Sequence, residues 1–180
     1  MADDKTKIDE DKQQDFPKRT NQLIALTALI LAICATFSSL YAGANASKGI
    51  LSQNKATDSW AYYQAKSMKE TMYRIQLDVL KLNPPTDGQN VEALKAKWQS
   101  EIERYDKEET EIKDAAIAHE ADRDKFLALN RGFAGALTFL QIAILLTSLA
   151  GLMKQIFFWY AGIAIGAFGI FNFATTMSTM

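Results

Sequence analysis

Three stretches of the chain are apolar and carry no charged residue: residues 21–44, 132–153 and 156–175. A helix rises about 1.5 Å per residue, so each stretch is long enough to cross the hydrocarbon core of a bilayer, which is roughly 30 Å thick. The pattern therefore predicts three transmembrane helices. Only Lys154 and Gln155 separate the second from the third, which favours a tight antiparallel pair in the membrane.

Residues 45–131, between the first two spans, follow a pattern typical of amphipathic helices. Between Lys48 and Leu82, apolar residues recur at alternating spacings of four and three, which is the a/d repeat of a coiled coil. We expect this seam to pack against the helix that returns to the membrane. It comprises Ala61, Ala65, Met68, Met72, Ile75, Val79 and Leu82.

A second heptad register follows residues 83–88, where two prolines and a glycine predict a turn. Polar residues interrupt it at Lys95, Glu109, His119 and Arg123, so we expect a weaker seam than the outgoing one. The register comprises Val91, Trp98, Ile102, Tyr105, Ile112, Ala116 and Phe126.

The two segments that flank this turn are matched in length and complementary in charge. Residues 45–82 and 90–131 number 38 and 42. The outgoing segment Lys48–Lys81 carries six basic and three acidic residues, whereas Glu92–Lys125 carries seven basic and eleven acidic residues. Antiparallel pairing about the turn would bring the basic segment against the acidic one.

Pairing of this kind sets Lys66 and Lys69 opposite Asp106 and Glu103. Exposed ion pairs contribute only about 0–1 kcal/mol each, so they specify register more than they stabilise. The expected fold is an all-α membrane protein with three transmembrane helices and a long extramembrane antiparallel hairpin that resembles a coiled coil.

The charge balance narrows the class of protein further. The chain has 20 basic and 21 acidic residues, and this near balance argues against a nucleic-acid partner. No charged residue lies in any of the three spans, and this segregation excludes a soluble single domain. Residues 1–20 are polar and predict a disordered tail. The first span could instead be a signal peptide, but the acids before it and its length favour an uncleaved helix.

Few residues offer chemistry. The single cysteine, Cys34, excludes an intramolecular disulfide, and His119 is the only histidine. Phosphate-binding glycine loops, nucleophile elbows and zinc motifs are absent from the sequence. The spans hold no ionisable side chain of the kind that ion-coupled transporters keep at the membrane midplane. We therefore expect no enzymatic activity, no metal and no cofactor.

The stretch Trp60–Lys69 is the candidate interaction site. Its aromatic residues either pack across the hairpin, with the lysines meeting the acidic segment, or form a recognition surface for another subunit or an envelope protein. The candidate residues are Trp60, Tyr62, Tyr63, Gln64, Lys66 and Lys69.

At these residues the chain resembles a bacterial membrane family known as domain of unknown function 4337. The resemblance rests on the W-A-Y-Y-Q-A-K-S-M-K stretch at Trp60–Lys69, preceded by Asn54, Lys55 and Asp58, and extends from about residue 20 onward. It implies one N-terminal span, a helical extramembrane region and two C-terminal spans. It implies no activity, cofactor or catalytic residue.

Two functions fit these features. The first is a homo-oligomeric scaffold that organises the bacterial envelope, and the second is a pore or channel subunit in which Ser38, Ser39 or Gln141 lines a lumen. For either, we expect a cyclic homo-oligomer in the inner membrane, with a cytoplasmic N-terminus and a periplasmic hairpin. Close packing of spans is expected at a G-x-x-x-G match and the glycine that follows it, either between copies or within one chain. These residues are Gly162, Gly166 and Gly169.

Overall fold

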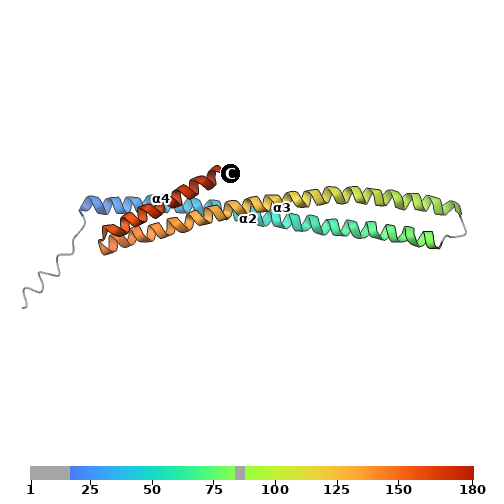
Figure 1. Ribbon diagram of the computed structural model, residues 1–180, viewed down its shortest axis with the longest axis horizontal. Coiled ribbons are helices and arrows are strands. Elements are labelled where there is room, and N and C mark those ends of the chain that lie inside the picture. The colour runs from blue at the N-terminus through green and yellow to red at the C-terminus, as the bar shows by residue number, and fades with distance from the viewer. Residues whose placement is uncertain (1–16, 84–87) are drawn as a thin grey trace, which may run out of the picture. The chain divides into compact units, whose positions relative to one another are not determined.

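The computed structural model describes residues 17–83 and 88–180, and these residues form three helices with no strand among them (Figure 1). Helix α2 spans Lys18–Leu82, α3 spans Gly88–Met153 and α4 spans Ile156–Ser178. Each contains an apolar stretch long enough to cross a membrane, which confirms the all-helical class and the three candidate spans. The expected tail at residues 1–20 and the turn at residues 83–88 lie mostly outside the described residues.

The helix ends have local causes. The Pro17 carbonyl accepts hydrogen bonds from the Thr20 and Asn21 amides at 2.8 and 3.3 Å, which satisfies two of the donors that a helix N-terminus leaves open. Helix α3 stops at Lys154, whose φ of 53° is left-handed, a conformation in which a helix ends. Helix α4 begins two residues later, so the short connection predicted at Lys154 and Gln155 is confirmed.

The described chain divides into two units. The apolar unit combines Leu127–Met180 with the described part of Met1–Ala46, and the charged unit is Ser47–Phe126. Helices α2 and α3 each run without interruption from one unit into the other.

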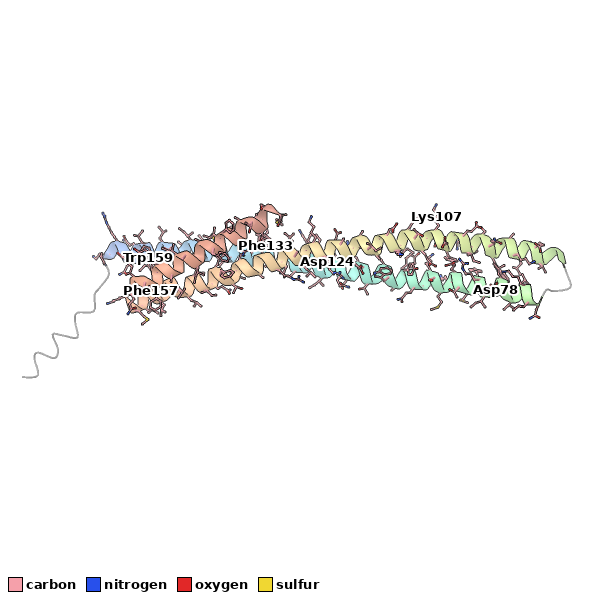
Figure 2. All side chains as sticks on the ribbon, viewed as in Figure 1. Asp78, Lys107, Asp124, Phe133, Phe157 and Trp159 are labelled. Carbon is pink, nitrogen blue, oxygen red and sulfur yellow. The ribbon has the colours of Figure 1, made fainter. Side chains whose placement is uncertain are left out.

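All three helices contribute to the core of the apolar unit. Leu31 and Ala35 of α2 pack with Leu140 and Ala143 of α3, and all four are buried. Phe133 of α3, labelled in Figure 2, is fully buried, and its ring lies 5.3 Å from that of Tyr41 in α2 and 5.5 Å from that of Phe173 in α4. These contacts connect α4 to both other helices.

Three glycines bring α4 close to its neighbours within one chain. Gly162, Gly166 and Gly169 are all buried. A Cβ at Gly162 would lie 3.1 Å from the Ala143 carbonyl oxygen and 2.7 Å from Thr147 Oγ1, both in α3. A Cβ at Gly166 would lie 2.6 Å from a methyl of Leu31, so these glycines already pack against the same chain rather than face a second copy.

In the charged unit, α2 and α3 lie side by side (Figure 1), and the burial of side chains agrees with the register expected of α3. All seven of its residues, from Val91 to Phe126, are buried or half-buried. The expectation for α2 was wrong. Every residue of the seam Ala61, Ala65, Met68, Met72, Ile75, Val79 and Leu82, which we call the α2 stripe, is exposed.

Helix α2 instead faces α3 through a second heptad phase, which we call the α2 inner face. Its members are buried or half-buried and also alternate in spacings of three and four. They are Gly49, Ser52, Ala56, Ser59, Tyr63, Lys66, Glu70, Tyr73, Leu77 and Leu80.

The polar residues of the α3 register explain this choice of phase. Glu109 is buried, and Lys95, His119 and Arg123 are half-buried. Had the apolar stripe packed there, these groups would have lost water without gaining hydrogen-bond partners, at a cost of roughly 1–3 kcal/mol for each group. The inner face is itself polar, and its Lys66 pairs with Glu108 while its Glu70 lies next to Glu109.

We expect Gly162→Ala to destabilise the apolar unit by about 1–3 kcal/mol, because the new methyl meets α3 backbone atoms that cannot move aside. Gly135→Ala is the matched control, since a Cβ there meets nothing within 4 Å. Unfolding of both variants in detergent, followed by circular dichroism, measures the difference. Equal stability of the two would contradict the close approach of α4 to α3.

Candidate interaction site

Trp60 and Tyr63 occupy the side of α2 that meets α3. The Trp60 indole donates a hydrogen bond of 2.9 Å to Glu120 Oε1, and its ring meets that of Tyr63 edge-on, with centroids 5.7 Å apart. Both aromatic residues are half-buried. They pack within the charged unit, as one of the two alternatives expected.

Lys66 is the ionic link between the helices. Its Nζ lies 2.5 Å from Glu108 Oε2. The pairing expected from the sequence set Lys66 opposite Asp106 instead. The ammonium also sits 5.2 Å from the centroid of the Tyr62 ring and 5.1 Å from that of Tyr105. The hydrogen bond between Lys66 and Glu108 raises the pKa of the lysine and lowers that of the glutamate.

The other three candidate residues face outward. Tyr62, Gln64 and Lys69 are exposed, so the structure does not gather the six residues of the candidate site into one surface. Lys69 borders a hollow of about 410 Å³, which Met72 of the α2 stripe also lines. Tyr105 of α3 lines the same hollow, so Lys69 lies beside both the stripe and α3.

Two buried carboxyl groups were not singled out from the sequence. Glu70 of the α2 inner face and Glu109 of α3 are each only 8% exposed. Arg74 Nε donates to Glu70 Oε1 at 2.6 Å, whereas Glu109 Oε1 is buried without a hydrogen-bond partner. Both residues occupy heptad positions that face the other helix. A charged residue at such a position is the sequence signal that identifies them.

The environment of Glu109 favours its neutral form. Burial is the main cause that raises the pKa of Glu109, and its hydrogen bond with Glu70 and the charges of Glu70 and Asp106 raise it further. Arg74 opposes this shift. A carboxyl that holds its proton more tightly can share it with its neighbour, as closely spaced acids do.

A second cluster of polar side chains lies at membrane depth, between α2 and α3 of the apolar unit. Gln141 and Ser39 are exposed and, among the described residues, have no hydrogen-bond partner. They line a groove of about 390 Å³, which we call the membrane groove. Its lining residues are Ala32, Ala35, Thr36, Ser39, Leu40, Leu137, Gln141 and Ile144.

Ser38, the third candidate for a polar lumen, points elsewhere. It is fully buried and donates a hydrogen bond of 2.7 Å to the Phe133 carbonyl. The hydroxyl is therefore engaged between α2 and α3 and does not line the membrane groove.

Residues that hold metal ions do not cluster in the described ranges: no group of three or more His, Cys, Asp or Glu side chains is placed to bind one. The described side chains interact with one another through aromatic rings, hydrogen bonds and ion pairs.

The raised pKa of Glu109 predicts that the charged unit gains stability as the pH falls. A folded state that holds its proton more tightly is favoured between the folded pKa and the ordinary value of about 4.5. Below that window, the Lys66–Glu108 pair loses its contribution, because the pKa of Glu108 is lowered. Thermal unfolding of the full chain in lipid discs between pH 7 and about 5 measures the gain.

Glu109→Gln should remove most of this dependence, because the amide does not titrate. Glu103→Gln, at an exposed position of the same helix, is the control and should leave it unchanged. A pH dependence that persists in Glu109→Gln would contradict the assignment.

Comparison with known proteins places these features in a family. The model of the family described as Domain of unknown function (DUF4337) matches residues 20–179. Neither the curated proteins nor the solved structures gave a match. The matched region holds all of α3 and α4, and all of α2 except Lys18 and Arg19. The chain therefore belongs to the family defined by domain of unknown function 4337.

Proposed function

We propose that this chain is the subunit of a homo-oligomeric scaffold in the bacterial inner membrane, with its charged unit projecting as an antiparallel helical hairpin. Contacts in the charged unit support the hairpin, because they follow opposite orders along the two helices. Gln53 meets Arg123, Trp60 meets Glu120 and Lys66 meets Glu108.

One observation carries the proposal of a homo-oligomer: the exposed amide of Gln141. This residue lies at the middle of the expected span 132–153, where neither water nor lipid tails satisfy its hydrogen bonds. An unsatisfied amide there costs several kcal/mol. Ser39 adds a second unpartnered polar group to the same groove.

A second copy of the chain suits this groove. The Gln141 amide both donates and accepts, so the same residue in another copy can satisfy it. Ala32 and Ala35 line the groove as well, and small residues let helix backbones approach closely in a membrane. Copies of one chain most often close into a ring, so we propose cyclic symmetry.

A pore subunit is the second candidate, and the same groove favours it. In a ring, Ser39 and Gln141 would face a lumen if the grooves surrounded the axis. Most of the groove lining is apolar, however, including Leu40, Leu137 and Ile144, and Ser38 is occupied between helices. The scaffold is therefore the better-supported function. Conductance of the reconstituted chain in planar bilayers would favour the pore instead.

The candidate site supports binding rather than catalysis. The polar ends of Trp60 and Lys66 are held by carboxylates, and none of the contacts places a nucleophile beside a base. Tyr62, Gln64 and Lys69 remain exposed for an envelope protein. We propose no cofactor and no nucleic-acid partner.

We expect Gln141→Leu to lower the copy number of the complex, because it removes the amide that a second copy satisfies. The mass of the chain in native lipid discs should fall towards the 20.1 kDa of one chain. Gln141→Asn keeps the amide and should restore association. The control Ile142→Leu changes an exposed residue beside it and should have no effect. A wild-type mass of one chain would refute the proposal.

The proposed orientation places the charged unit in the periplasm. In a Cys34→Ala background, Lys107→Cys at an exposed position of α3 (labelled in Figure 2) should react with a membrane-impermeant maleimide in intact spheroplasts. Reaction only after lysis would place the charged unit in the cytoplasm.

A further inference from the structure

The α2 stripe is an apolar surface for which a single copy of the charged unit provides no partner. Its five large residues, from Met68 to Leu82, are between 54% and 79% exposed. They lie on a helix whose other side is already engaged with α3, since the inner face is turned roughly 150° away at about 100° per residue. A water-facing helix that exposes an apolar stripe of this length, while its other side already contacts α3, favours a second partner.

The surface along the stripe is hollowed in a way that fits side chains of another helix. One hollow, of about 410 Å³, is lined by Met72 with Tyr73 and Tyr105. The next, of about 220 Å³, is lined by Ile75 and Val79 with Trp98 of α3. Both hollows are lined by residues of α2 and α3 together, so they form recesses beside the stripe that side chains of a neighbouring helix can enter.

We infer that the α2 stripe is the interface between copies, in which stripes of two or more chains meet as a parallel, in-register coiled coil. This inference rests on the proposed homo-oligomer and identifies the surface that holds it together outside the membrane. In this arrangement α2 lines the common axis and α3 lies outside it.

A second copy fits better than an unrelated helix for two reasons. Chains inserted in one membrane share one orientation, so their α2 helices run parallel and identical stripes meet in register. The residues on either side of the stripe then meet across the interface, one from each copy. The pairs are Gln64 with Lys69, Thr71 with Gln76 and Asp78 with Asn83. None of these pairs brings like charges together, so nothing in the flanks opposes parallel association.

The N-terminal residues of the same chain are a poorer occupant. Residues 1–16 contain only Met1, Ala2, Ile8 and Phe16 as apolar residues, among eight acids and lysines between Asp3 and Lys12 alone. They have no heptad spacing that could fill the two hollows.

Disulfide trapping in the full chain tests the inference. In a Cys34→Ala background, Ile75→Cys should form a disulfide-linked dimer of the chain on mild oxidation in native lipid discs, because in-register copies bring this position beside itself. Ile117→Cys is the matched control: this isoleucine is also exposed in the charged unit, at 48%, but lies on α3 away from the stripe. It should form none.

A second pair of variants excludes chance collision. Adding Met72→Glu to the Ile75→Cys chain should abolish the linked dimer, whereas adding Ile117→Glu should leave it unchanged. An oligomeric wild-type mass without a linked dimer at position 75 would overturn the inference and leave the proposed function standing. A wild-type mass of one chain would refute both.

Discussion

The contact between α2 and α3 in the charged unit depends on one constraint: two buried helix faces must match in polarity. The face that α3 presents contains Glu109, Lys95, His119 and Arg123. Lys66 of the more polar phase of α2 pairs with Glu108, next to Glu109, and Arg123 meets Gln53 from beside that phase. The apolar phase of α2 is consequently exposed.

The apolar unit presents the complementary problem. Its helices pack closely through glycines and small residues, so most of its polar groups find partners within the chain, as Ser38 does with the Phe133 carbonyl. Gln141 and Ser39 do not, and in lipid an unsatisfied polar group is costly. The charged unit therefore exposes apolar side chains along the α2 stripe, and the apolar unit exposes the polar side chains of Gln141 and Ser39.

The sequence predicted much of the fold because the strongest signals were local. Charge-free runs identified the three spans, and the break at Lys154 and Gln155 placed the last connection correctly. The register of α3 was also correct, although polar residues interrupt it. Trp60 and Lys66 both contact α3, in agreement with the alternative that candidate residues pack across the two helices.

The register of α2 was wrong for a physical reason. Choosing the most apolar heptad assumes that the most apolar face is buried within the chain, whereas a chain that associates with copies of itself can reserve that face for them. The α2 helix carries two heptad phases, and only the partner's polarity decides between them. Glu109 interrupts the apolar register of α3, and Glu70 belongs to the less apolar phase of α2, so a search for apolar seams passes over both residues.

Methionine footprinting tests most directly whether the α2 stripe is covered by another copy. Met68 and Met72 are 68% and 56% exposed in a single chain, so hydroxyl radicals should oxidise both readily in a monomer. Our account predicts that both are protected in native membranes and become reactive when the chain is dispersed to single copies in detergent. Equal oxidation of the two methionines in both states would contradict the account.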